Sequence, residues 1–252
     1  MSDGEIALSI RGLCKSFGAL PVAQSISLEV KRGARLGLIG PNGAGKTSLV
    51  NLLTGMLSAD AGEILLEGQP IGHLKPERRV HLGLVRTHQI NTLLVETSLR
   101  ENVAIAVAER EKIAWRLMRF TRRWRDCLDE ADARLVTLGI RDQADRRVAE
   151  LPYGQQRLLE IAIALVLRPR VLLLDEPAAG VPAGEAHAIH DMLERLPADI
   201  SILMIEHDMD LVFRFAREIA VLVQGRVLTV GTPREIAADP QVRAVYLGRS
   251  AA

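Results

Sequence analysis

One segment of the chain has the residue types of a phosphate-binding loop. It lies between an apolar run at 36–39 and a stretch of helical periodicity at 48–53. Its glycines would let successive backbone N–H groups turn toward phosphate oxygens, and the helix that follows would add the positive end of its dipole. The pattern G-x-x-x-x-G-K-T therefore predicts a loop that binds phosphate groups. The residues expected to form this site are Gly40, Pro41, Asn42, Gly43, Ala44, Gly45, Lys46, Thr47 and Ser48.

An acidic pair farther along the chain could supply hydrolytic chemistry. Asp175 and Glu176 directly follow an apolar run, and Pro177 forces a turn after them. Beside a phosphate loop, Asp175 would hold magnesium together with Thr47, while Lys46 would reach the outer phosphates. Glu176 would orient and polarise an attacking water. By itself such a pair could be no more than charged surface, but with the loop upstream it predicts phosphate hydrolysis.

A second glycine-bearing turn precedes another helix. Residues 151–157 read Leu-Pro-Tyr-Gly-Gln-Gln-Arg, and the helical pattern of 158–167 follows until Pro169 ends it. A helix N-terminus of this kind is a further anion site. Two phosphate-facing helix ends so far apart in the sequence would act on the same nucleotide only if two copies face each other.

The period of the apolar pattern predicts the elements that position these residues. Alternating residues at 6–10 and 26–30 indicate half-exposed antiparallel strands, and a Gln224-Gly225 step predicts a hairpin leading into 227–230. Helical periodicity dominates 90–168. The expected fold is an α/β core with a mixed sheet, an N-terminal antiparallel β segment and an inserted α-helical subdomain. The runs expected to be strands of a parallel sheet covered on both faces are 36–39, 171–174, 202–205 and 219–223.

The composition excludes several classes of protein. A 252-residue chain that is 48% apolar can form a full core, so intrinsic disorder is excluded. With 32 Lys and Arg against 31 Asp and Glu, there is no bulk attraction to nucleic acid or anionic lipid. The longest apolar run, about seven residues, is far short of the ~20 that a membrane-spanning helix needs. Residues 1–11 lack the layout of a secretory signal, and two cysteines form no disulfide framework, so we expect a soluble cytoplasmic chain.

These motifs, in this order, resemble the ATP-binding subunits of ABC transporters over nearly the whole chain. The further segments that carry the resemblance are an aromatic loop (Lys15-Ser16-Phe17-Gly18), a glutamine loop (Arg86-Thr87-His88-Gln89), the signature at 151–156 and a switch segment (Ile205-Glu206-His207-Asp208). The resemblance implies a P-loop NTPase fold with ATP and Mg²⁺ as cofactors. It implies one ABC ATPase domain over 1–252, with the nucleotide-binding core in 1–89 and 169–252 and a helical signature subdomain in 90–168.

The resemblance also implies a role for each motif residue. Phe17 would stack on adenine, Gln89 would touch magnesium and the attacking water, and His207 would contact the γ-phosphate. Lys46 and Glu176 complete the catalytic set. The signature residues Tyr153, Gly154 and Gln155 would face a nucleotide held by an opposing cassette. Closing two cassettes over ATP would exclude water and thereby strengthen the contacts to the phosphates.

Several details are most similar to the branched-chain amino acid uptake group, and among its two ATPases to the longer one. They are Arg-Thr before the loop residues His88 and Gln89, the form of the signature, Pro-Ala-Ala-Gly after Glu176, an insert near 108–125 and a terminal Tyr246-Leu247-Gly248. The implied partners are transmembrane permease subunits, a second ABC ATPase and, indirectly, an external substrate-binding protein. The implied location is the cytoplasmic face of the inner membrane, bound peripherally through the permease.

Two departures from the family pattern affect the expected dimer. Pro152 stands where most signatures have Ser, so it lacks both the hydroxyl and the backbone N–H that could reach a γ-phosphate. Pro182 stands where the family usually has Asp or Asn at the dimer seam. We hypothesise that the chain pairs with a different ATPase whose signature keeps Ser, so that the two nucleotide sites are unequal.

Other interpretations stay open at this point. The basic, aromatic stretch 110–125 fits a solvated helix, a surface that meets anionic lipid headgroups or the permease, or a nucleic-acid contact. A soluble ABC ATPase acting on nucleic acid or ribosomes would share this core, although such proteins commonly carry two cassettes, coiled coils or zinc hooks. The ATPase of a lipid or lipopolysaccharide exporter would share the Tyr-Leu-Gly ending. The sequence does not reveal the transported molecule.

Overall fold

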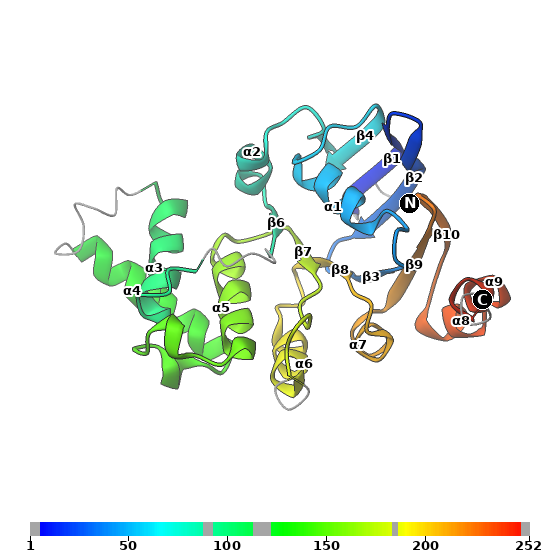
Figure 1. Cartoon of the computed structure of the whole chain (residues 1–252). Coiled ribbons are helices and arrows are strands. Elements are labelled where there is room, and N and C mark those ends of the chain that lie inside the picture. Colours follow the sequence, from blue (N-terminus) through cyan, green and yellow to red (C-terminus); the bar gives the residue numbers. More distant parts are fainter. Residues whose placement is uncertain (1–5, 88–92, 113–121, 183–185, 248–252) are drawn as a thin grey trace. The chain divides into compact units, whose positions relative to one another are not determined.

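The chain divides into two compact units in the computed structural model, which describes residues 6–87, 93–112, 122–182 and 186–247 (Figure 1). Unit 1 comprises Met1–Arg86, Arg170–Glu176 and Ala198–Ala252. Unit 2 comprises Thr87–Pro169 and Pro177–Pro197. The phosphate loop and the acidic pair therefore belong to unit 1, and the signature belongs to unit 2.

Unit 1 contains a four-stranded antiparallel sheet with the order β2-β1-β4-β5. The alternation near the N-terminus is that of β1 and β2, where Leu8, Ile10, Ile26 and Leu28 turn to the buried face. The strands are β1 (Ile6–Phe17), β2 (Leu20–Lys31), β4 (Ala61–Leu66) and β5 (Gln69–Pro70).

A six-stranded sheet with the order β10-β9-β3-β8-β7-β6 positions the chemistry of unit 1. Its strands run parallel except β10, which pairs with β9 as an antiparallel hairpin. Every residue of β7 and β8 is buried, as expected for a parallel sheet covered on both faces. The strands are β3 (Arg35–Ile39), β6 (Leu84–Arg86), β7 (Val171–Asp175), β8 (Ser201–Ile205), β9 (Glu218–Val223) and β10 (Arg226–Gly231).

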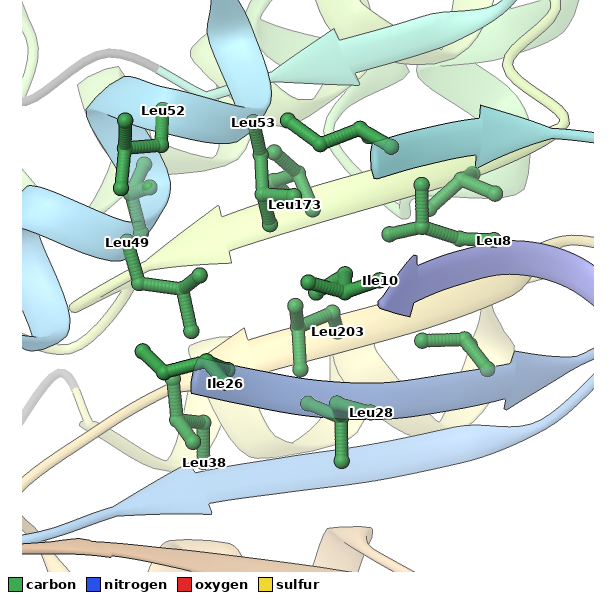
Figure 2. Close-up of a cluster of buried hydrophobic side chains, with 14 of the residues drawn as sticks. Leu8, Ile10, Ile26, Leu28, Leu38, Leu49, Leu52, Leu53, Leu173 and Leu203 are labelled. Carbon is green, nitrogen blue, oxygen red and sulfur yellow. The ribbon is translucent and has the colours of Figure 1, made fainter. Parts of the chain in front are cut away.

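The core of unit 1 joins the two sheets and the helix after the phosphate loop. Figure 2 shows Leu8 and Ile10 of β1, Leu203 of β8 and leucines of α1 (Lys46–Thr54) in one cluster of buried side chains. Burying side chains of this size stabilises the fold by roughly 1.5–3 kcal/mol each. The loop is thus carried between a strand and a helix that are both fixed in one core. The other helices of unit 1 are α2 (Pro76–His81), α7 (Met209–Phe215), α8 (Pro233–Ala238) and α9 (Pro240–Leu247).

Unit 2 is helical. Its first helix begins at a capping box, in which Ser98 and Glu101 satisfy each other's backbone N–H groups, and its apolar face packs on the two helices that follow. Gly139, with a φ of 73°, lies just beyond the helix that ends at Thr137. The elements are α3 (Leu99–Arg110), α4 (Arg122–Thr137), the 3-10 turns η3 (Arg141–Gln143) and η4 (Val148–Glu150), α5 (Tyr153–Val166) and α6 (Ala186–Arg195).

The mixed α/β fold predicted from the sequence is confirmed. Helix α6 belongs to unit 2 and packs against α5, a tertiary contact that the period of the sequence does not encode. The expected subdomain limits, 90–168, stay a prediction. Most of the basic stretch 110–125 lies outside the described residues. Among the described residues, no helix is both long and apolar enough to cross a bilayer.

Candidate functional site

Three motifs of unit 1 end on one edge of the six-stranded sheet. Ile205, the last residue of β8, is the register partner of Leu38 in β3 on one side and of Asp175 in β7 on the other. The phosphate loop starts two residues after Leu38, and His207 follows Ile205 by two residues. Because the strands are parallel, their carboxyl ends lie together, which is where open α/β sheets bind ligands.

Close packing explains two glycines of the phosphate loop. Gly45 has a φ of 102°, and a Cβ there would lie 2.5 Å from the carbonyl oxygen of Val22. A Cβ on Gly40 would fall inside contact distance of the Leu222 carbonyl oxygen. Any side chain at either position would push the loop away from β2 or β9.

Lys46, the first residue of α1, reaches back over the loop. Its Nζ donates to the carbonyl oxygens of Gly40 at 2.6 Å and Pro41 at 3.2 Å. Burial lowers the pKa of Lys46, and the charges of Glu176 and Asp175 oppose that shift. The ammonium therefore lies between the loop and the acidic pair, where it would face the outer phosphates of a bound nucleotide.

The acidic pair lies where β7 ends. Asp175 is the last strand residue and is only 6% exposed. Glu176 has left the strand in a left-handed conformation, with a φ of 48°, and its N–H donates to the Ile205 carbonyl oxygen at 2.8 Å. A non-glycine residue in this region is strained, and such strain is common at functional sites. The turn separates the two carboxylates, so they have different surroundings.

His207 lies next to Glu176 and above a buried carboxylate. Its Nδ1 is 3.9 Å from Glu176 Oε1 and 3.5 Å from Glu206 Oε2. The Glu206 side chain is 1% exposed, and its Oε2 accepts from the backbone N–H groups of His207 at 2.9 Å and Asp208 at 3.3 Å. The Asp208 side chain in turn caps α7 by accepting from Leu211 N–H. The backbone of His207 is therefore fixed by its hydrogen bond to Glu206, while its imidazole ring is mostly exposed.

An arginine connects two parts of the site. Arg86 Nη2 lies 2.5 Å from Asp175 Oδ2, and Arg86 Nη1 donates to Asn51 Oδ1 at 3.0 Å. Arg86 belongs to the glutamine-loop motif, but sequence reasoning gave it no role; nor did it single out Asn51 or Glu206. Arg86 ends β6, a short strand that the sequence analysis did not predict, and β6 pairs with the strand that ends in Asp175.

The aromatic residue expected to stack on a base is exposed at a hairpin tip. Phe17 pairs with Leu20 across the β1–β2 turn, and its side chain is 53% exposed. Lys15 Nζ lies 5.8 Å from the ring centroid and is also paired with Asp60 at 2.6 Å. Val22, two residues after Leu20, touches the phosphate loop at Gly45, so the hairpin rises beside the loop.

The oxygen donors of unit 1 fit a magnesium ion that also binds phosphates. Thr47 offers a hydroxyl at the start of α1, and Asp175 offers a carboxylate at the same edge of the sheet. Magnesium is usually held by one or two protein oxygens, with water and substrate phosphates filling its other positions. Among the described residues, no group of three or more His, Cys, Asp or Glu side chains is arranged so that it could hold a metal ion. Gln89 and His88 lie outside the described residues.

The signature starts a helix of unit 2. Pro152 is the N-cap of α5, and Tyr153, Gly154 and Gln155 form its first turn. The Arg157 guanidinium lies 5.2 Å from the Tyr153 ring centroid, and Gly154 is buried. Gln155 Oε1 is buried without a hydrogen-bond partner in the described part of the chain. The predicted helix N-terminus is therefore present, without a side-chain cap.

The C-terminal helix adds a contact to the phosphate loop. Burial raises the pKa of Tyr246 to about 12, and the backbone N–H of Gly40 opposes that shift. The Tyr246 hydroxyl therefore lies near the first residue of the loop. The Tyr-Leu-Gly ending was noted in the sequence only as a family feature.

Two family models match the chain. The model described as "ABC transporter" matches residues 23–179, which include the phosphate loop, the signature and the acidic pair. A second, described as "Branched-chain amino acid ATP-binding cassette transporter", matches residues 226–252.

Curated proteins are similar over almost the full length of the chain. The high-affinity branched-chain amino acid transport ATP-binding protein LivG of Escherichia coli (strain K12) is 37% identical, covering 96% of this chain and 98% of that protein. BraF of Pseudomonas aeruginosa, which carries the same description, is 36% identical with the same coverage. A probable LivG of Methanocaldococcus jannaschii is 32% identical and covers 98% and 100%.

Solved structures agree with the fold. An ATP-binding cassette of an ABC transporter in its ADP conformation superposes with a TM-score of 0.84 at 31% identity, covering 97% of this chain and 99% of that one. A nucleotide-free ATP-binding cassette from an ABC transporter gives a TM-score of 0.82 at 30% identity, with 96% and 98% covered.

Proposed function

The chain belongs to the ABC transporter family as an ATP-hydrolysing cassette coupled to transport, and on this premise we propose that it drives an importer of branched-chain or related amino acids. The observation that carries the proposal is the shared sheet edge, where Ile205 aligns the strands that end in the phosphate loop, the acidic pair and His207. The cargo class is supported by the descriptions of the full-length relatives and by the match at 226–252.

We infer that the backbone of residues 40–47 and Ser48 bind the phosphates of ATP. Lys46 supplies the cation that faces the outer phosphates, and Phe17 provides an exposed ring for the adenine base. Thr47 and Asp175 would hold magnesium, with Gln89 as a further expected ligand. When bound, magnesium would neutralise charge on the phosphate oxygens.

Hydrolysis needs a water placed in line with the terminal phosphate. Glu176 is half-buried and turned out of the strand, so its carboxylate can accept a proton from, and orient, that water. His207 lies 3.9 Å from Glu176, and its exposed ring can donate to the γ-phosphate. Buried Glu206 holds the backbone of His207, so the histidine approaches the phosphate from a fixed position.

We further propose that hydrolysis requires an opposing cassette. The signature residues Tyr153, Gly154 and Gln155 are not needed by the chain's own loop in this scheme; they face the nucleotide of the partner. Pro152 offers neither a hydroxyl nor an N–H there, so the site completed by this chain's signature would be the weaker one. The chain would therefore pair with a different ATPase whose signature keeps a donor.

Turnover measurements test the unequal pair. Glu176→Gln in this chain and the matching change in the companion ATPase should reduce ATP hydrolysis by the assembled transporter to different extents. Equal losses would contradict the unequal pair and leave a symmetric dimer.

The proposed partners are two permease subunits and, outside the membrane, a substrate-binding protein. As a peripheral subunit held by the permease, the chain would lie on the cytoplasmic face of the inner membrane. The relatives' descriptions do not favour a role on nucleic acid or ribosomes, nor in lipid export. The basic stretch 110–125 stays a candidate membrane-facing surface, and neutralising Arg119, Arg122 and Arg123 would test it by liposome association.

Co-purification tests the importer function. The chain should co-purify with membrane subunits, and ATP hydrolysis by that complex in proteoliposomes should rise when a binding protein loaded with leucine is added. Stimulation by lipid or RNA instead, with none from loaded binding protein, would contradict the proposal. A Glu176→Gln complex controls for contaminating ATPases.

A further inference from the structure

The guanidinium of Arg86 is fixed at two of its nitrogens within unit 1. Nη2 is bonded to Asp175 Oδ2 at 2.5 Å, and Nη1 to Asn51 Oδ1 at 3.0 Å. The arginine side chain is 13% exposed and the Asp175 side chain 6%. Because both side chains are largely buried, these charge-assisted hydrogen bonds are less screened and more directional than a surface ion pair.

The two partners of Arg86 come from the two elements that carry the metal donors. Asn51 lies four residues after Thr47 on α1, so both side chains lie on the same face of that helix. Asp175 ends β7, the strand that pairs with β6 next to Arg86. Arg86 therefore joins the helix that carries the Thr47 hydroxyl in its first turn to the strand that ends in the Asp175 carboxylate.

Such an arginine can have one of three roles. Its role can be purely structural, linking α1 to β7. Alternatively, it competes with a metal ion for the Asp175 carboxylate, or it orients that carboxylate for the metal ion. Competition would require the guanidinium to withdraw, yet Asn51 holds it from the other side. A carboxylate that binds a metal is usually hydrogen-bonded in turn by an outer partner, and that partner fixes its orientation. Asn51 and Arg86 together form such an outer layer.

We propose, resting on the nucleotide and metal site of the proposed function, that Arg86 is a positioning residue that orients Asp175 for magnesium. Arg86 Nη2 donates a hydrogen bond to Asp175 Oδ2, and this bond fixes the rotation of the Asp175 carboxylate. Lysine at this position would keep the charge but would replace the rigid, planar guanidinium with a single flexible ammonium, so it would orient the carboxylate less strictly.

Metal affinity, measured without turnover, tests this role. The full chain is saturated with a non-hydrolysable ATP analogue and titrated with Mn²⁺, and free Mn²⁺ is followed by electron paramagnetic resonance. Arg86→Lys should weaken Mn²⁺ binding about 10- to 100-fold, the usual effect of losing an outer partner. Asn51→Ala, which removes the hydrogen bond to Arg86 Nη1, should weaken it in the same direction. Binding of the analogue in EDTA should be unchanged in both variants.

Matched variants separate the possible failures. Arg100→Lys removes an arginine that is paired with Asp132 and Asp145 in unit 2, and it should leave Mn²⁺ affinity unchanged. Asp175→Asn tests the metal site itself: if it does not weaken Mn²⁺ binding, the proposed site is wrong. If Asp175→Asn weakens Mn²⁺ binding but Arg86→Lys leaves it unchanged or strengthens it, the site stands and the positioning role is overturned. Equal losses of analogue binding in EDTA and of Mn²⁺ binding would also overturn it. Thermal melting of every variant confirms that the chain is folded.

Discussion

The carboxylate of Glu206 accepts a hydrogen bond of 2.9 Å from the backbone N–H of the next residue, His207. Glu206 is 1% exposed and directly follows β8, so it is fixed by the sheet. His207, with a side chain that is 62% exposed, is free to meet a ligand only with its ring. The buried Glu206 thus fixes the backbone of this segment, and the exposed ring of His207 is left for the γ-phosphate contact that we propose.

Removing the Glu206 carboxylate should slow ATP hydrolysis. Glu206→Ala leaves the N–H groups of His207 and Asp208 without this acceptor, at a cost of about 1–3 kcal/mol. If that cost falls on the transition state, the rate drops roughly 5- to 150-fold. Steady-state turnover of the assembled transporter measures it, and Glu206→Gln, which keeps an acceptor oxygen, should recover part of the rate. Full activity in Glu206→Ala would show that His207 needs no such support.

Lys46→Met should weaken nucleotide binding by the isolated chain. The ammonium would make charge-assisted hydrogen bonds to the outer phosphates, each worth about 1.5–3 kcal/mol, so affinity for ATP should fall roughly 10- to 150-fold. Titration with a fluorescent ATP analogue measures this loss. AMP, which lacks the outer phosphates, should bind both proteins alike. A loss of equal size for AMP would mean that Lys46 supports the loop and does not contact those phosphates.

Arg157→Met should destabilise the fold, and more at neutral than at acid pH. Arg157 and Glu160 form a 2.8 Å pair in which each side chain is 7% exposed. Burial raises the pKa of Glu160, and Arg157 opposes that shift. Without Arg157 the pKa would rise further, so the folded state would hold a proton that the unfolded state releases above about 4.5. The free energy of unfolding of the variant therefore falls as the pH rises above about 4.5 toward the raised pKa of Glu160.

Urea unfolding at pH 5 and pH 7.5 measures that effect. Leaving the buried carboxylate unpaired costs about 3–5 kcal/mol at pH 7.5, and the loss should be smaller at pH 5, where Glu160 is protonated more readily. Replacing both residues, as Arg157→Met with Glu160→Leu, should restore most of the stability. An equal loss at both values of pH would rule out the carboxylate as its origin.

Arg79 should stabilise the C-terminal end of α1, the helix that follows the phosphate loop. Its buried guanidinium donates to the carbonyl oxygens of Leu52 and Leu53 in α1 and to those of Gly72 and Leu74. Arg79→Met leaves these acceptors unsatisfied and should cost at least about 2 kcal/mol of unfolding free energy, measured by urea denaturation.

A variant next to Arg79 makes a second test. Gly55 ends α1 with a φ of 81°, and a Cβ there would lie 2.9 Å from Arg79 Nε. Gly55→Ala should therefore destabilise the wild-type chain. In the Arg79→Met background the clash with the guanidinium is removed, while the backbone strain and the 3.2 Å approach to the Leu74 carbonyl oxygen remain, so the effect of Gly55→Ala should be smaller. Strictly additive losses would mean that the contact with Arg79 contributes nothing.

The main lines of the fold and of the candidate site could be predicted because each signal was local. Apolar runs and their periods gave the buried strands, and the phosphate loop was recognisable from its spacing alone. Glu176 was predicted because it follows an apolar run, and His207 because the segment around it resembles the family's switch segment. Arg86, Asn51 and Glu206 were not assigned roles, because each acts through a partner far along the chain, and such pairs leave no periodic pattern in one sequence.

The sequence alone determined which chemical groups are present: a glycine loop with Lys46 and Thr47, carboxylates after an apolar run and a second glycine-bearing turn before a helix. Only the tertiary structure decided how these parts are held together. The register of Ile205 with Leu38 and Asp175 brings distant strand ends to one edge, and Arg86 ties Asp175 to Asn51. The physical reason is that the local sequence decides which side chains are present and on which face of its own strand or helix each one lies. Which groups meet across the sheet depends on strand order and on the shared core, and these form only when the whole unit packs.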